Sequence, residues 1–183
     1  MNMMNGFTRG LIAALLMVSA GSQAAPVRDE VRAYRAAHEK QIVTDFMTLL
    51  AMPNVATNVP DVDKNAAYIE GLLKARGFST QLLRAEPGTP ATVFAELKVP
   101  GAKRTVEFYA HYDGQPVAQK GWIIRPFEPS MRTALPDSQP EDWKDAAGPL
   151  DADWRIFARS SGDDKGSIQA LVSAFDALKA SGK

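Results

Sequence analysis

Segments with the apolar spacing of helices alternate with segments of strand character along this 183-residue chain, and this alternation restricts its fold more than any other feature. In residues 27–50, apolar side chains recur at three- and four-residue steps, as in an amphipathic helix. Similar spacing predicts helices at 62–75 and 164–180, and short apolar runs predict strands between them. The expected strands are 80–83, 92–99, 105–110 and 155–158. The sequence therefore predicts a layered α/β fold.

Two regions of this pattern have a more specific interpretation. Residues 105–110 are almost continuously apolar, which is typical of a central strand that is buried on both faces. Residues 126–152 are rich in proline, aspartate and glycine, and they predict a long loop. Loops of more than about 12–15 residues are uncommon in compact domains unless they serve a function or are disordered. We therefore expect one of those two roles for this loop.

Residues 1–24 have the features of a secretory signal peptide. Arg9 precedes the apolar run LIAALLMVSA, and small residues around Ala24 match a signal-peptidase site. The run is shorter than the roughly 20 apolar residues that cross a bilayer, so no integral membrane span is predicted. The sequence predicts a protein exported to the periplasm or secreted, with a folded domain at 28–183; the alternative is an uncleaved membrane anchor.

The charge balance and the lack of cysteine exclude several classes of function. Lysine plus arginine and aspartate plus glutamate number 21 each and do not form blocks, so no nucleic-acid-binding surface is predicted. Without cysteine there can be no disulfide, thiolate metal site or cysteine nucleophile. A serine hydrolase is also disfavoured, because the chain has no Gly-x-Ser-x-Gly motif.

A histidine and an aspartate follow the expected strand at 105–110. His111 and Asp113 are two residues apart, so in an extended chain their side chains point to the same face. Imidazole can bind zinc through one nitrogen while a nearby carboxylate orients the ring. Ligands also tend to bind beyond the carboxyl ends of strands in open α/β sheets. A histidine hydrogen-bonded to a turn aspartate, with no metal, remains the alternative.

A second polar cluster lies between the expected strand at 155–158 and the last helix. Here Asp163 and Asp164 follow small residues and precede Lys165. Acidic residues favour a helix N-terminus, so both aspartates could simply cap the helix. A carboxylate has two oxygens, however, and one aspartate could instead bridge two metal ions.

Taken together and in order, these motifs resemble those of the zinc-dependent aminoacylase/carboxypeptidase metallopeptidase family. That family includes glutamate carboxypeptidase, acetylornithine deacetylase, succinyl-diaminopimelate desuccinylase and the carnosine-type dipeptidases. The residues that carry the resemblance are HYDGQPV at 111–117, Trp122 with PFEP at 126–129, and FARSSGDDKG at 157–166. The resemblance implies a three-layer α/β/α zinc-peptidase-like catalytic domain, of which residues 28–183 would be an incomplete N-terminal portion.

The resemblance also implies a role for each matched residue. His111 corresponds to a ligand of one zinc ion, and Asp113 to the catalytic-site aspartate that orients this histidine. Asp163 corresponds to the ligand that bridges two zinc ions, and Asp164 to its non-ligand neighbour. The expected substrates are small peptides or N-acyl amino acids. Complete relatives often dimerise through an inserted domain that would be missing here.

The sequence departs from the family pattern in two respects. Ala158 and Ser160 stand where the family usually has glycine, so we expect a strained backbone angle there. The chain also has no Glu-Glu pair to supply the general base and a neighbouring ligand, and its other histidine, His38, is expected on the solvated face of a helix.

Two functional hypotheses follow. The first is a zinc-dependent peptidase or amidohydrolase by family, with at most partial zinc binding and no activity expected from this chain alone. The second is an exported, non-catalytic module that binds a metal or a partner.

Overall fold

The computed structural model describes residues 24–182 except 118–119 and 136. The predicted signal peptide therefore lies outside the described residues, apart from Ala24. The helices are α1 (Ala24–Leu50), α2 (Val59–Lys74) and α3 (Lys165–Ala180). The strands are β1 (Ser79–Leu83), β2 (Thr92–Glu96), β3 (Ser130–Arg132) and β4 (Arg155–Phe157). The predicted α/β class is confirmed, and all three helices form within three residues of their expected bounds.

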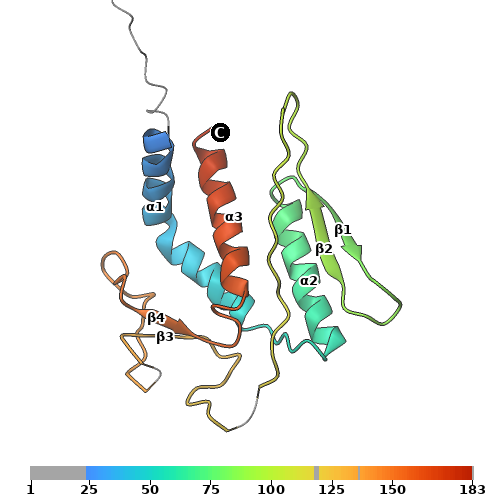
Figure 1. Cartoon of the computed structure of the whole chain (residues 1–183). Coiled ribbons are helices and arrows are strands. Elements are labelled where there is room, and N and C mark those ends of the chain that lie inside the picture. The colour runs from blue at the N-terminus through green and yellow to red at the C-terminus, as the bar shows by residue number, and fades with distance from the viewer. Residues whose placement is uncertain (1–23, 118–119, 136, 183) are drawn as a thin grey trace, which may run out of the picture.

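Helices and strands pack in pairs (Figure 1). α1 lies beside α3, and α2 covers one face of the antiparallel pair β1–β2, in which Ser79 is opposite Glu96 and Leu83 is opposite Thr92. β3 and β4 form a second antiparallel pair. The region 126–152 is thus not wholly a loop, because β3 lies within it. Its three residues are too short to give a recognisable strand pattern.

The prediction of a central, buried strand at 105–110 is wrong. In the described part of the chain this segment is extended but pairs with no strand, and Val106 and Phe108 are each 71% exposed. A strand forms only where another backbone offers hydrogen bonds, and none is supplied here. The expected strand at 92–99 is also shorter, since pairing with β1 ends at Glu96.

The main apolar core joins all three helices. Leu49 of α1, Ile69 of α2 and Ile168 of α3 form its buried centre, at 1%, 5% and 7% exposure. Ala110 and Tyr112 pack against this centre, so the end of the extended segment is fixed although its middle is not. The core therefore places the first polar motif next to the start of α3.

A buried lysine connects α1 to α3. The Lys165 side chain is fully buried, and its Nζ donates hydrogen bonds to the carbonyl oxygens of Leu49, at 2.8 Å, and Met52, at 2.7 Å. The last carbonyls of a helix have no intrahelical partner, and here the Leu49 carbonyl otherwise accepts only a long bond from the Met52 N–H, at 3.4 Å. Lys165 supplies this carbonyl and that of Met52, just beyond the helix, with a closer donor. Because Lys165 begins α3, these bonds hold the start of α3 against the end of α1.

We predict that Lys165→Met lowers the free energy of unfolding by about 2 kcal/mol, because it removes two hydrogen bonds to the carbonyl oxygens of Leu49 and Met52. Denaturant titration near pH 9, where the native amine is neutral, measures this loss. Lys64→Met serves as the control, because Lys64 is 70% exposed on α2. Equal stability of the two variants would contradict the anchoring role of Lys165.

The burial of Lys165 also makes the stability of the fold depend on pH. It lowers the pKa of Lys165 from an ordinary 10.5 to about 7. Between about pH 7 and 10 the unfolded chain then binds more protons than the folded chain, so the free energy of unfolding rises with pH. We expect a rise of roughly 2 kcal/mol from about pH 7 to 9, measured by denaturant titration, and a smaller one in Lys165→Met. The same slope in both proteins would refute this.

Candidate functional site

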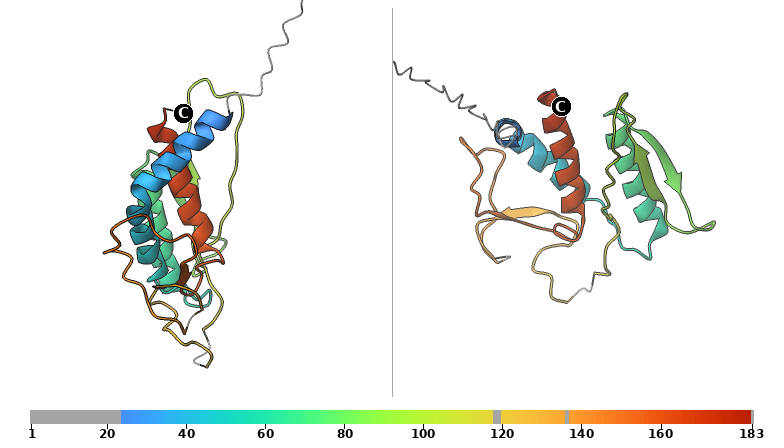
Figure 2. Two further views of the ribbon diagram at one scale, coloured as in Figure 1. Left: turned by 90° about the vertical axis from the view of Figure 1, so that its left-hand side faces the viewer. Right: turned by 45° about the horizontal axis from the view of Figure 1, so that its top comes forward.

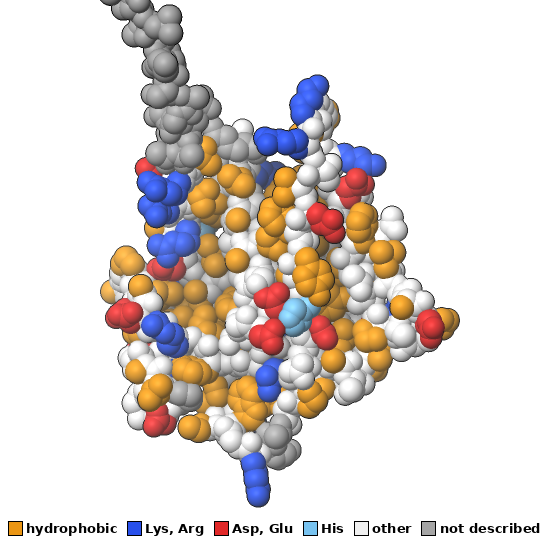
Figure 3. Space-filling model, viewed as in Figure 1, with side chains coloured by type: hydrophobic (Ala, Val, Ile, Leu, Met, Phe, Trp, Pro, Cys, Tyr) orange, Lys and Arg blue, Asp and Glu red, His pale blue; other side chains and the backbone are white. Residues whose placement is uncertain are grey.

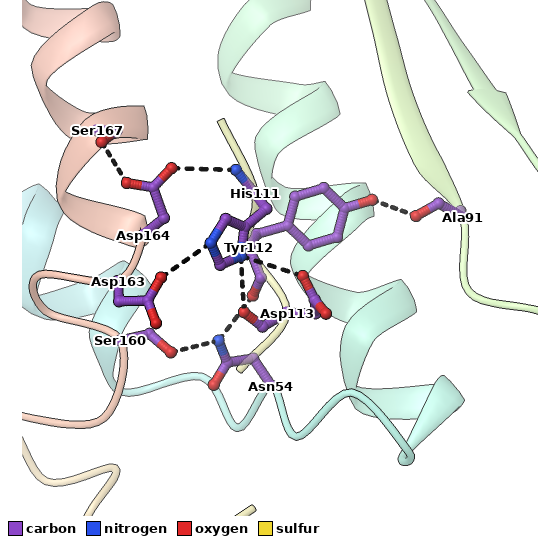
Figure 4. Close-up of polar contacts among 9 residues, drawn as sticks. All are labelled: Asn54, Ala91, His111, Tyr112, Asp113, Ser160, Asp163, Asp164 and Ser167. Carbon is purple, nitrogen blue, oxygen red and sulfur yellow. Dashed lines mark hydrogen bonds and ion pairs between the residues drawn. The ribbon is translucent and has the colours of Figure 1, made fainter. Parts of the chain in front are cut away.

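The first polar motif lies at the end of the extended segment (Figure 4). His111 Nδ1 is 3.2 Å from both the carbonyl oxygen and Oδ1 of Asp113. Both of these atoms are acceptors, so Nδ1 carries a proton and donates to them. In the neutral imidazole, Nε2 is consequently the nitrogen with a free lone pair.

Asp163, from the second motif, faces this free nitrogen of His111. Asp163 lies in the turn between β4 and α3, and its Oδ1 is 2.9 Å from His111 Nε2. The side chain of Asp163 is 79% exposed and that of His111 is 35% exposed. The two motifs that the sequence predicted to converge are therefore adjacent in space, although 52 positions separate them.

Asp164 is occupied by other contacts. Its Oδ2 accepts a hydrogen bond from the backbone N–H of His111 at 3.3 Å, and its Oδ1 accepts one from the Ser167 hydroxyl. It is also the N-cap residue of α3, and the peptide bond that joins it to Asp163 is cis. With both oxygens engaged, Asp164 positions His111 and leaves the neighbouring Asp163 to face the imidazole.

Sequence reasoning missed Asn54, which fixes the turn after His111. Its side chain is fully buried, and Nδ2 donates to the Tyr112 carbonyl at 2.7 Å and to Ser160 Oγ at 2.9 Å. Its backbone carbonyl accepts from Gly114 N at 2.7 Å. One residue thus connects the end of α1 to both motifs. The only signal in the sequence was the Pro53-Asn54 pair, which indicates the end of a helix.

Close packing around Asn54 leaves no room for a side chain at position 114, and the neighbouring Ser160 has an unusual backbone angle. A Cβ on Gly114 would lie 2.6 Å from Ser160 Oγ, closer than real Cβ contacts, and 3.0 Å from Asn54 Oδ1, which is unusually tight. Ser160 has φ +64°, the left-handed region that favours glycine. The strain expected at Ser160 is confirmed. It costs roughly 1–2 kcal/mol, and the hydrogen bond from Asn54 offsets part of this cost.

The carboxylates also change the acidity of His111. Partial burial alone would lower its pKa, but hydrogen bonds to the Asp113 carbonyl and to the Asp163 and Asp113 carboxylates outweigh burial and raise it. The site therefore favours a cation at Nε2. That cation can be a proton or a metal ion, because both occupy the same lone pair.

The donor set fits a zinc ion in part. A tetrahedral zinc holds nitrogen and oxygen ligands about 2.0–2.2 Å away, so two ligands lie about 3.4 Å apart. His111 Nε2 and Asp163 Oδ1, at 2.9 Å, would need to separate by only a few tenths of an ångström. Among the residues that the structure describes, however, no group of three or more candidate ligands occurs. A catalytic zinc site typically has about three protein ligands.

Other residues near the motifs are structural. Arg159 lies over the Trp122 ring, 5.0 Å from its centroid, and donates to the Pro116 carbonyl at 3.3 Å. It thereby holds the chain that follows the first motif.

His38 is exposed on α1, where its Nδ1 is 2.8 Å from the Tyr34 carbonyl, as the sequence predicted for a solvated helical residue. Within the described residues, no helix is both long and apolar enough to cross a membrane.

Comparisons with known proteins show which fold the chain shares. No protein-family model and no curated protein matches the chain. Among solved structures, the di-peptidase Dug1p from Saccharomyces cerevisiae superimposes with a TM-score of 0.63 at 20% identity, over 88% of this chain and 32% of that one. Human carnosine dipeptidase 1 gives a TM-score of 0.65 at 21% identity, over 85% of this chain and 32% of that one.

The chain shares the fold of a part of each of these two dipeptidases. It spans about a third of the length of these two dipeptidases.

We predict that the pKa of His111 is raised above that of an ordinary histidine and that Asp163→Asn lowers it, because the variant removes one carboxylate acceptor. NMR titration of the imidazole protons measures both values. Asp153→Asn is the control, since the Asp153 side chain is 91% exposed and contacts Arg155 rather than His111. An unshifted pKa of His111 in Asp163→Asn would contradict the contact.

Proposed function

We propose that this chain carries part of the active site of a zinc-dependent peptidase or amidohydrolase that acts on small peptides or N-acyl amino acids. One observation carries the proposal: His111 Nε2 and Asp163 Oδ1 lie 2.9 Å apart, in a fold shared with dipeptidases. A nitrogen lone pair beside a carboxylate oxygen supplies two of the ligands that bind a divalent cation.

Each residue of the site has a distinct task in this proposal. His111 and Asp163 are the ligands, and Asp113 holds the imidazole in the tautomer that leaves Nε2 free. Asp164 receives the backbone N–H of His111 and fixes where the ring stands. When bound, zinc would supply a Lewis acid that polarises the scissile carbonyl and makes water more acidic.

A non-catalytic function is the second candidate. The described residues supply two donors to one ion, and the sequence has no Glu-Glu pair to provide a base. Such a site can bind a metal without activating water. Under this alternative the protein is an exported module that captures metal or a partner. Export itself, predicted from residues 1–24, is shared by both candidates.

Zinc titration by calorimetry distinguishes a metal site from a simple hydrogen-bonded histidine. We expect zinc to bind, and Asp163→Asn to weaken binding by more than about tenfold through loss of one ligand. Asp153→Asn is the matched control, because it makes the same chemical change at a remote, exposed position. Equal zinc affinity of the wild type and Asp163→Asn would refute the assigned ligand.

An assay of dipeptide hydrolysis distinguishes the zinc-dependent hydrolase from the non-catalytic module. We expect no zinc-dependent hydrolysis of dipeptides by the purified chain alone, because a base and a third ligand are not supplied by the described residues. Release of free amino acids, followed by chromatography with and without a chelator, provides the measurement. Chelator-sensitive hydrolysis would contradict this expectation and would favour a complete catalytic site.

A further inference from the structure

Asp113 and Gly114 form the one Asp-Gly pair in the sequence. In such a pair, the backbone nitrogen of the glycine can attack the side-chain carbonyl carbon of the aspartate and close a five-membered succinimide ring. Glycine favours this step, because it has no Cβ to hinder the nitrogen and its backbone is flexible. Ring closure at this pair is therefore easier than at aspartates that precede larger residues.

The pair lies where water can reach it. The Asp113 side chain is 50% exposed. The left view of Figure 2 shows the extended segment that leads to this turn along the outside of the molecule, and Figure 3 shows acidic side chains beside a histidine at the surface. A succinimide formed at Asp113 would consequently be open to hydrolysis.

The packing of the turn requires the residue that makes Asp113 reactive. A Cβ at position 114 would lie 2.6 Å from Ser160 Oγ, so a larger residue fits only if the turn shifts. The aspartate is also in use, because its Oδ1 is 3.2 Å from His111 Nδ1. The geometry of the site thus places a reactive pair of residues next to His111.

The same turn restrains the attacking nitrogen. The Gly114 N–H donates to the Asn54 backbone carbonyl at 2.7 Å, and the Gly114 carbonyl accepts from the Ala56 N–H at 2.9 Å. The buried Asn54 side chain also donates to the Tyr112 carbonyl at 2.7 Å. A nitrogen held in this way cannot turn toward Asp113 Cγ while these bonds are intact. Ring closure therefore requires local opening of the turn.

We propose that Asp113 is a site of isoaspartate formation, and that the contacts of Asn54 with the turn suppress the reaction in the folded chain. With the Asp113 carboxyl protonated, a bond forms between its Cγ and the Gly114 nitrogen, and one carboxyl oxygen leaves as water together with the amide proton. Water then opens the ring. Cleavage between the nitrogen and the main-chain carbonyl carbon of Asp113 gives isoaspartate, and cleavage at Cγ restores aspartate. Water is the only co-reactant.

Isoaspartate at position 113 removes the contacts that orient His111. The main chain becomes one methylene longer there, and the carboxylate is attached directly to Cα. The Asp113 carbonyl oxygen and Oδ1, which are each 3.2 Å from His111 Nδ1 (Figure 4), then lose these positions. The modification thus alters the site, but its chemistry does not depend on the function proposed for that site.

Ageing of the native protein and of the free peptide 105–120 in the same neutral buffer tests the proposal. Peptide mapping separates the isoaspartate form, which has an unchanged mass, from the aspartate form. The free peptide should isomerise at Asp113, and the same peptide with Gly114→Ala should do so more slowly. The native protein should isomerise at least about tenfold more slowly than the free peptide, because its turn opens only rarely.

A variant of Asn54 tests what restrains the turn. Asn54→Ala removes the side-chain hydrogen bonds to Tyr112 and Ser160, so it should raise the isomerisation rate of the folded chain by about tenfold. Asn58→Ala is the matched control, because it makes the same change at the N-cap of α2, where the side chain accepts from the Asp61 N–H. Its rate should match that of the wild type. Circular dichroism verifies that both variants are folded.

Three results would overturn the proposal. They are a free peptide that isomerises no faster than its Gly114→Ala form, a native protein that isomerises as fast as the free peptide, and a folded Asn54→Ala that isomerises no faster than Asn58→Ala. If Asn54→Ala does not fold, hydrogen exchange of the Gly114 amide in the wild type replaces it. Protection of this amide supports the restraint, and exchange at the rate of the free peptide overturns it.

Discussion

The buried Lys165 side chain, at the C-terminal end of α1, makes the contacts on which the rest of the structure depends. It binds the carbonyl oxygens of Leu49 and Met52, and it immediately follows Asp163 and Asp164. Anchoring this one side chain therefore fixes the turn that carries both carboxylates. A polar group buried in such a place is tolerated only because its donors have partners.

The end of α1 organises the other half of the site as well. Asn54 lies two residues beyond Met52, and its side chain holds the Tyr112 carbonyl and Ser160. His111 is thus positioned between an aspartate that is fixed through Lys165 and a turn that is fixed through Asn54. The strained backbone of Ser160 is tolerated because these contacts determine it on several sides. The functional geometry is a consequence of how α1 ends.

Much of this arrangement could be predicted from local sequence. The helices follow from apolar spacing, and the meeting of His111 with Asp163 was expected from two motifs whose residue types suit one cation. Lys165 and Asn54 could not be identified in this way, because lysine and asparagine are mostly exposed and only tertiary packing buries them. The segment 105–110 was misread for a related reason. Its composition indicates a buried strand, but burial depends on a partner that sequence pattern alone cannot supply.

A histidine whose Nε2 faces a carboxylate suits a cation, and the proposed function makes zinc the cation to test. The most direct test is a crystal structure of the chain grown with zinc. We predict an ion within about 2.0–2.2 Å of both His111 Nε2 and an Asp163 carboxylate oxygen. The two side chains well apart, with no ion between them, would contradict the account.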